Sequence, residues 1–358
     1  MDSRRKLVHE VLSSGVSLSE ACRLAGVTRP TGRKWVKRAR AVGIENICEL
    51  SRAPQTSPGK TPPELEGPLL ELKARYPEWG ARKLVVLLRR ESGLNLSSRT
   101  ADEVLRRNGL TAPRPVAAEP IRFERETCGA LLQTDFKGLP KSAPYALLSV
   151  LDDYGRYCFN FGPVPDKTGA SVKQALWTLF DRHGLPDSML MDNGDCWGAV
   201  SSKAPTAFEA WLMRLGIKPI HGRPGHPQTQ GKVERFHRTA KLEMGERLVQ
   251  ESFEAAQEAC REFVERYNWV RPHDALGGAV PGTRYRAFPR ARPDQLPEHD
   301  IPEDAISRKV DDTGFFSLKG RRYKIGRGLI AERIVVREDV LGLRTFYCGF
   351  PLPYLFEL

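Results

Sequence analysis

The chain has 358 residues, of which 40% are hydrophobic and 28% are charged, which is enough apolar material for two or three globular domains. No run of about 18 apolar residues occurs, and no long apolar stretch follows the charged N-terminus, so we expect neither a membrane span nor a secretory leader. The seven cysteines are scattered singly, without the spacing of a zinc site or a disulfide framework. This pattern predicts reduced thiols in a cytoplasmic protein that has no membrane partner.

The positive charge is concentrated near the N-terminus. The net charge is +12, and residues 1–112 contain 21 Lys and Arg against 12 Asp and Glu. Most of the excess therefore lies in the first third of the chain. A basic end of this kind indicates a polyanionic partner, most often nucleic acid.

Three short apolar-periodic segments follow one another between residues 4 and 42. Ser17 or Ser19 can cap the middle segment, and Gly26 marks a tight turn before the last one. The last segment places Trp35 in a core and turns its basic residues outward, so the expected DNA contacts are Arg29, Arg33 and Lys34. The pattern predicts a helix-turn-helix whose last helix can enter the major groove, although a generic three-helix bundle with a basic face would look similar.

A second helical unit is expected at 64–112, after a linker at 50–63 that is rich in Pro, Ser and Thr. Its third segment begins with a cap at Ser97 or Ser98, and the helical spacing exposes Arg99 to solvent. Two such modules in tandem indicate a bipartite DNA site, because each module alone reads few base pairs.

From Thr127 onward the pattern changes to strands followed by alternating helices, which predicts an α/β sheet covered by helices on both faces. Short alternating apolar stretches near the C-terminus predict a small β-barrel. The expected fold is therefore multidomain, with all-α helix-turn-helix modules, a central α/β core and a C-terminal barrel. The expected domains are residues 1–49, 64–112, 126–285 and 306–358, joined by linkers at 50–63, 113–125 and 286–305.

Three acidic residues occupy positions that favour catalysis. Asp135 lies late in the first expected strand, and Asp192 lies where another strand meets a turn, as catalytic groups of open α/β sheets often do. Glu234 lies on an expected helix with Arg238 and Lys241 on the same face, at the fourth and seventh positions after it. Each acid alone has an ordinary alternative explanation as a turn residue or a member of a surface ion pair.

Taken together, these acids carry a resemblance to a known family. The order Asp, then Asp-Asn-Gly, then Gly-x-x-Glu-Arg-Phe, with Lys241 seven residues after Glu234, is similar to the integrase-type transposases of bacterial insertion sequences. Those enzymes belong to the ribonuclease H-like DDE superfamily, alongside retroviral integrases. Further matches are His226-Pro227-Gln228, the stretch YNWVRPHDAL at 267–276, and Trp79-Gly80.

The sequence departs from the family pattern near the second acid. The segment between Asp192 and Glu234 is 41 residues long, more than is usual in the family, and Asp195 adds another acid to the turn. Asp195 therefore competes with Asp192 for the second position of the triad.

The resemblance implies a ribonuclease H-like fold for residues 126–285, with Asp135, Asp192 and Glu234 as the catalytic and metal-binding triad. Three carboxylates and no His or Cys suit hard cations, and two ions of Mg²⁺ or Mn²⁺ per active site are expected. The implied reaction is cleavage at a transposon end, followed by attack of the exposed 3′-hydroxyl on target DNA without a covalent enzyme intermediate.

The resemblance also implies the partners. They would be double-stranded DNA, as terminal inverted repeats and as target, and further copies of the chain in a homo-oligomer on that DNA. Lys241 and Arg238 would contact the DNA near the cut. The protein would work in the bacterial cytoplasm and lie at the nucleoid when bound to DNA.

Several alternatives stay open from the sequence. They are a DNA-binding regulator, a relic with an inactive integrase-like core, and a metal-dependent nuclease without strand transfer. Asp152 and Asp153 are rival acids, although we expect them to stabilise a hairpin turn. Arg271 and His273 are expected to brace the catalytic helix.

Overall fold

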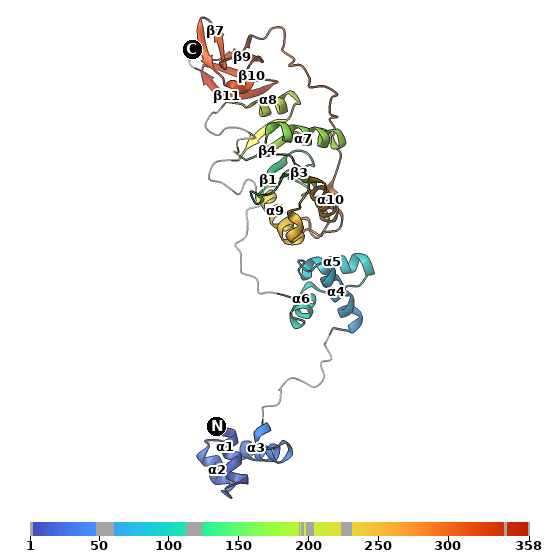
Figure 1. Ribbon diagram of the computed structural model, residues 1–358, viewed down its shortest axis with the longest axis vertical. Coiled ribbons are helices and arrows are strands. Elements are labelled where there is room, and N and C mark those ends of the chain that lie inside the picture. The colour runs from blue at the N-terminus through green and yellow to red at the C-terminus, as the bar shows by residue number, and fades with distance from the viewer. Residues whose placement is uncertain are drawn as a thin grey trace. The chain divides into compact units, whose positions relative to one another are not determined.

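The computed structural model describes residues 3–47, 61–111, 124–192, 194, 197, 204–222, 231–339 and 342–356. Residues 1–60 and 61–358 form two compact units (Figure 1). The predicted site residues Asp135, Asp192 and Glu234 all lie within the described part. Asp195 and the segment His226-Pro227-Gln228 lie outside it.

The first unit is the predicted helix-turn-helix. Its helices are α1 (Ser3–Leu12), α2 (Leu18–Leu24) and α3 (Arg29–Val42), followed by the 3₁₀ turn η1 (Ile44–Asn46). The Ser17 hydroxyl accepts a hydrogen bond from the Glu20 amide and caps α2, and Gly26 turns the chain with a φ of 63°. Trp35 is buried, and a Cβ added at Gly32 would lie only 2.2 Å from Cys22 Sγ, so α2 and α3 approach closely.

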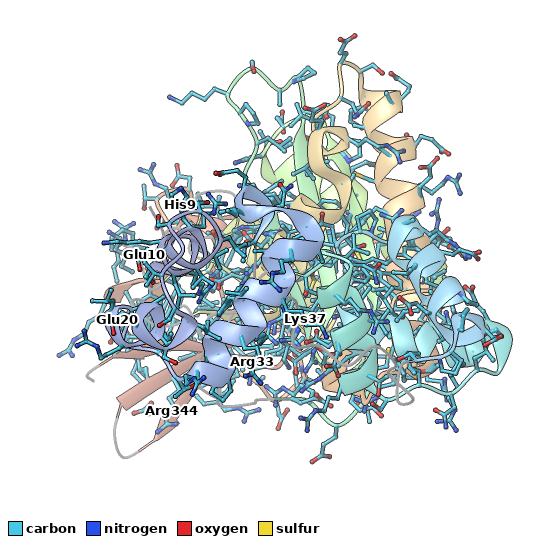
Figure 2. All side chains as sticks on the ribbon, turned by 90° about the horizontal axis from the view of Figure 1, so that it is seen from below. His9, Glu10, Glu20, Arg33, Lys37 and Arg344 are labelled. Atoms are coloured by element: carbon cyan, nitrogen blue, oxygen red, sulfur yellow. The ribbon has the colours of Figure 1, made fainter. Side chains whose placement is uncertain are left out.

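The basic residues of α3 face solvent, as the sequence predicts. Arg29, Arg33 and Lys34 are exposed, and Figure 2 shows Arg33 and Lys37 extending from this helix. A packed helix with one basic exposed face is the arrangement that a recognition helix requires.

The second unit begins with another small helical module. Its helices are α4 (Pro63–Arg75), α5 (Ala81–Ser92) and α6 (Ser98–Arg107). Leu69, Leu84 and Leu105 meet in its core, and the Ser97 hydroxyl caps α6 by accepting from the Thr100 amide. Arg99, in the first turn of α6, is exposed as predicted.

A five-stranded mixed sheet forms the centre of the second unit. Its strands are β1 (Leu132–Lys137), β2 (Ala146–Asp152), β3 (Cys158–Val164), β4 (Ser188–Met191) and β5 (Lys218–His221). The strand order is β3-β2-β1-β4-β5; β1 to β3 pair antiparallel, and β4 and β5 continue the sheet in parallel. Every predicted strand of this region is present, whereas β5 was not predicted, because its four residues include a Pro and show no clear alternation.

Helices cover both faces of the sheet, which confirms the prediction (Figure 1). The helices are α7 (Gly169–His183), α8 (Ala207–Arg214), α9 (Gly231–Met244) and α10 (Phe253–Trp269). Strand β2 is buried throughout and serves two cores: Leu148 packs with α7 and α8, while Leu147 and Leu151 pack with α9 and α10. This alternation decides which side chains of the sheet can face α9.

The segment that follows the sheet domain, 286–305, is packed against it. Phe288 belongs to the core shared with α7, and the Leu185 amide donates to the carbonyl of Arg290. The short 3₁₀ turns η3 (Gly245–Leu248), η4 (Asp274–Leu276) and η5 (Pro281–Arg284) lie in the preceding connections.

The C-terminal region contains two open sheets, so the prediction of a closed barrel is wrong for the residues that the structure describes. Its strands are β6 (Ser307–Lys309), β7 (Phe315–Leu318), β8 (Arg321–Lys324), β9 (Arg333–Asp339), β10 (Gly342–Tyr347) and β11 (Phe350–Phe356), with the 3₁₀ turn η6 (Arg327–Leu329). They form a four-stranded sheet, β11-β10-β9-β6, and a separate β7-β8 hairpin. A barrel needs its first and last strands to pair. Here Phe316 of the hairpin instead packs on the sheet, in a core that includes Met213 of α8.

Across the described ranges, no helix is both long enough and apolar enough to cross a membrane.

Candidate active site

Asp135 and Asp192 lie at neighbouring positions on adjacent strands. Strands β1 and β4 pair in parallel, with Leu132 opposite Met189 and Gln133 opposite Leu190. The same offset places Asp192, the residue after β4, beside Asp135. Because side chains alternate along a strand, both carboxylates project to the face opposite Leu132 and Met189, which is the face covered by α9.

Helix α9 brings Glu234 to this face. Phe236 and Ala240 bury the inner side of α9 against the core that also contains Leu147 of β2. His237 Nε2 lies 2.6 Å from Ser149 Oγ, and His237 Nδ1 lies 3.7 Å from Asp135 Oδ2. Glu234 is one helical turn before His237 and exposed, so it lies on the side of α9 near Asp135.

The electrostatics of Asp135 reflect this clustering. Burial raises the pKa of its carboxyl from 3.8 to about 6, and the negative charges of Asp192 and Glu234 act in the same direction. The Phe136 amide, which donates to Asp135 Oδ1 at 2.8 Å, and the ammonium of Lys167 oppose this rise. Because the two neighbouring acids disfavour the ionised form of Asp135, a cation bound here would relieve the repulsion.

This raised pKa leads to a prediction for Asp135→Asn. The pKa of this carboxyl is near 4 in the unfolded chain and about 6 in the folded protein. Its contribution to stability is therefore fully present below pH 4 and is lost as the pH rises through about 6. In metal-free buffer at pH 7.5, the variant should therefore unfold with a free energy about 2 kcal/mol higher than the wild type. At pH 4 the two proteins should be equally stable, as measured by urea unfolding.

Added Mg²⁺ supplies the control for this prediction. It should stabilise the wild type at pH 7.5 and have little effect on the variant, because binding to the folded state alone raises stability. Equal stabilisation of both proteins by Mg²⁺ would show that Asp135 does not take part in metal binding.

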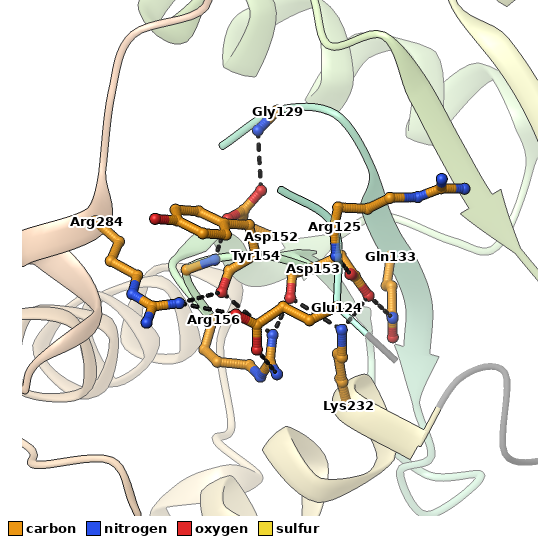
Figure 3. Close-up of polar contacts among 11 residues, drawn as sticks. Glu124, Arg125, Gly129, Gln133, Asp152, Asp153, Tyr154, Arg156, Lys232 and Arg284 are labelled. Atoms are coloured by element: carbon orange, nitrogen blue, oxygen red, sulfur yellow. Dashed lines mark hydrogen bonds and ion pairs between the residues drawn. The ribbon is translucent and has the colours of Figure 1, made fainter. Parts of the chain in front are cut away.

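The rival acids Asp152 and Asp153 are occupied by contacts within the protein (Figure 3). The Asp152 carboxylate accepts hydrogen bonds from the Gly129 and Gly155 amides, and burial raises its pKa to about 6. The Asp153 carboxylate accepts from the Arg125 amide at 2.7 Å and from Gln133 Nε2 at 2.8 Å. Asp152 thus stabilises the turn between β2 and β3, which is the role that the sequence predicts, whereas the Asp153 side chain joins this turn to β1 and to the segment before it.

Asp153 also holds the first turn of α9. Lys232 Nζ lies 2.5 Å from Asp153 Oδ1 and 3.0 Å from the Asp153 carbonyl oxygen, in a pair whose carboxylate is fully buried (Figure 3). Lys232 precedes Glu234 by two residues. The buried ion pair therefore positions the end of α9 that carries the third acid.

His221 and Glu209 are functional candidates that the sequence did not indicate. His221, at the end of β5, places Nδ1 3.0 Å from the Asp192 carbonyl oxygen and Nε2 3.0 Å from Glu209 Oε1. Both partners are acceptors, an arrangement that favours the doubly protonated ring. The hydrogen bond to Glu209 accordingly raises the pKa of His221.

Glu209 is itself fixed by a capping box with Thr206 at the start of α8. The main chain at Asp192 is thus held from β5 and α8 together. His221 is the first residue of the stretch HGRPGHPQ, and this was the only signal in the sequence. Its role follows from the pairing of β5 with β4.

Basic residues accompany the acids. Arg238 and Lys241 are exposed on the face of α9 that carries Glu234, as the helical spacing predicts. Burial, together with the nearby ammonium of Lys241, lowers the pKa of Lys137 at the end of β1. A cationic border around a carboxylate cluster suits a phosphate chain that reacts at metal ions.

The described side chains include no set of three His, Cys, Asp or Glu residues that are spaced as metal ligands. The chemistry of the donor set nevertheless suits a hard divalent cation, because Asp135, Asp192 and Glu234 are all oxygen ligands. Burial raises the pKa of Asp135, and the repulsion by Asp192 and Glu234 that adds to this rise is the second observation that fits a cation here.

The sheet order β3-β2-β1-β4-β5, with acids at the ends of adjacent strands and a third acid on the covering helix, defines an integrase-type ribonuclease H-like core. Comparison with known families agrees. Integrase core domain families match residues 126–227 and 215–281, and a helix-turn-helix domain family matches residues 3–51.

Individual relatives show the same relationship. The Gag-Pol polyprotein of Rous sarcoma virus subgroup C (strain Prague) is 32% identical over 109 residues, which cover 30% of this chain and 6% of that protein. The transposase for transposon Tn552 of Staphylococcus aureus is 26% identical over 232 residues, covering 56% of this chain and 46% of that protein. The putative transposase for insertion sequence element IS5376 of Geobacillus stearothermophilus is 24% identical over 363 residues. This match covers 96% of this chain and 84% of that protein.

The chain thus spans a small part of the viral polyprotein and less than half of the Tn552 transposase. Residues 126–281 are thus similar to integrase core domains, and the chain is similar to transposases of a transposon and of an insertion sequence.

Proposed function

We propose that the chain is a metal-dependent DNA transposase that cleaves at the ends of an insertion element and joins the exposed 3′-hydroxyl to target DNA. The observation that carries this proposal is the cluster of Asp135 and Asp192 beside the helix that bears Glu234. A regulator that only binds DNA has no need for two acids at the ends of adjacent strands beside a third on the covering helix, so this alternative is not favoured.

The three carboxylates are proposed as the ligands of two Mg²⁺ or Mn²⁺ ions, which would activate the attacking oxygen and stabilise the leaving oxygen. Asp135 would hold both ions, while Asp192 and Glu234 would hold one each. Ser149 and His237 support this arrangement from β2 and α9, because they contact each other and lie next to Asp135. Burial lowers the pKa of His237 to about 4, so this ring adds no charge at neutral pH.

The remaining residues are proposed to hold DNA. Lys241 and Arg238 would contact phosphates beside the cut. Arg29, Arg33 and Lys34 on α3 would read one part of a terminal inverted repeat, and Arg99 on α6 would contact another. Two transposon ends must be joined together, which favours a homo-oligomer assembled on DNA. Such a protein would act in the bacterial cytoplasm, at the nucleoid.

A strand-transfer assay tests this function. Labelled duplexes carrying the DNA that flanks the gene should be nicked at one position and joined to a target plasmid when Mg²⁺ is present. With EDTA in place of Mg²⁺, neither product should form. Specific binding to the same duplexes without any nicking in Mg²⁺ or Mn²⁺ would favour the regulator or the inactive relic.

A further inference from the structure

The second helical module is joined to the catalytic helix through one buried carboxylate, that of Glu243. Trp79 Nε1 donates to Glu243 Oε1 at 3.0 Å, and Arg271 Nε donates to the same oxygen at 2.7 Å. Arg266 Nε lies 3.7 Å from the other oxygen. Only 6% of the Glu243 side chain is exposed, and Trp79 is 2% exposed, so these contacts are shielded from water.

The partners of Glu243 come from distant parts of the chain. Trp79 precedes α5 in the second helical module and stacks on Tyr76, with ring centroids 4.1 Å apart. Arg271 follows α10 in the stretch YNWVRPHDAL. These two stretches, which the sequence presents as unrelated motifs, thus meet at one residue of α9.

A second row of contacts fixes the same interface. One face of α5 carries Lys83, Val86 and Arg90, at helical spacing. Lys83 Nζ lies 3.7 Å from Asp274 Oδ2, and Arg90 Nη2 donates to the Val270 carbonyl at 3.0 Å. Val270 itself packs against the core of the module. The module therefore rests on the segment after α10 as well as on α9.

The position of Glu243 along α9 makes this contact relevant to the chemistry. Glu243 is nine residues after Glu234, which corresponds to about 13 Å along the helix axis. Nine residues make about two and a half turns, so the two side chains lie on opposite sides of the helix. The contact therefore holds the side of the helix opposite to Glu234, which lies on the side near Asp135. A change in the docking of the module would therefore rotate or tilt the helix that carries the third acid.

We propose that Glu243 is a positioning residue that couples the second helical module to α9, so that DNA held by the module stimulates reaction at Glu234. The inference rests on the proposed function. In this proposal Trp79 couples the module to α9, and the DNA contacts of the module are made by α6, where Arg99 is exposed.

Two conservative variants test the coupling. Trp79→Phe keeps an aromatic ring to stack on Tyr76 but removes the N–H donor, and Glu243→Gln removes the charge. Trp269→Phe, the same change at a partly exposed tryptophan of α10, is the matched control. Single-turnover cleavage in Mg²⁺ would be measured on a duplex with the flanking end sequence and on a scrambled duplex, with binding measured by fluorescence anisotropy.

Both variants should cleave the end duplex at least tenfold more slowly than wild type, the loss expected for one hydrogen bond to a buried charged group. Cleavage of the scrambled duplex and affinity for the end duplex should stay within about twofold. The ratio of the cleavage rate on the end duplex to that on the scrambled duplex should therefore fall. The double variant should cleave the end duplex no more slowly than either single variant, because both changes remove the same contact. An unchanged ratio, or an equal loss on both duplexes, would overturn the coupling.

Hydrogen exchange distinguishes this inference from the proposed function. Binding of the end duplex should slow amide exchange in residues 231–244 of the wild type and of Trp269→Phe, but not of Trp79→Phe. This readout needs no cleavage. A wild type that binds ends but never cleaves them would defeat the transposase function alone, whereas equal protection of α9 in Trp79→Phe would defeat the coupling alone.

Discussion

Glu234→Gln should reduce end cleavage and strand joining by at least about 10³-fold, because a neutral amide cannot replace an ionised oxygen ligand beside two other acids. Affinity for the end duplex should stay within about twofold, since the expected recognition residues lie on α3 and α6. The variant should also fold normally, because Glu234 is exposed and packs against nothing in the core. The rates are measured in single-turnover assays with Mg²⁺.

Glu246→Gln is the matched control for this experiment. Glu246 is an exposed acid in η3, just beyond the end of α9, so the same change should leave the cleavage rate within about twofold of wild type. Asp135→Asn should reproduce the loss seen with Glu234→Gln. Substantial cleavage by either site variant in Mg²⁺ would remove that acid from the proposed triad.

Asp153→Asn should lower the free energy of unfolding by about 3 kcal/mol, the scale expected when one partner of a buried ion pair is removed. The Asp153 carboxylate is fully buried and joins Lys232, Gln133 and the Arg125 amide. An asparagine can satisfy only part of this set and leaves the Lys232 ammonium without its counter-charge. Urea unfolding of the full chain measures the change.

The control is Glu258→Gln, which breaks an exposed pair with Arg261 on α10. It should leave the free energy of unfolding nearly unchanged, because solvent already screens this pair. Lys232→Met should restore part of the stability lost in Asp153→Asn when the two changes are combined, since the unpaired ammonium is then gone. If Asp153→Asn were as mild as Glu258→Gln, the ion pair would not hold the first turn of α9.

Local patterns allowed much of the central domain to be predicted. The alternation in β1 and β2 and the amphipathic periods of α7 to α10 are properties of short segments, and each segment appears where it was expected. Asp135 could be chosen from its place late in a strand, and Glu234 from a helix face shared with Arg238 and Lys241. The role of the site as a whole came from the resemblance of the combined motif.

The errors and omissions arose where long-range pairing decides the structure. The C-terminal strands have the alternation of a barrel, yet whether a sheet closes depends on which edges pair, and β7 pairs with β8 alone. Strand β5 was missed because its four residues carry little pattern. Without it, neither His221 nor its link to Asp192 could be found.

The amino-acid sequence by itself determined the helix-turn-helix, the strands and helices of the core, and the acids proposed for catalysis, because periodicity, capping and turn chemistry act over a few neighbouring residues. The tertiary structure alone decided that Asp135 and Asp192 sit side by side, that Asp153 reaches Lys232, and that Trp79 and Arg271 share Glu243. Those contacts join residues up to 164 positions apart in the chain, and only the packing of sheet, helices and module brings them together.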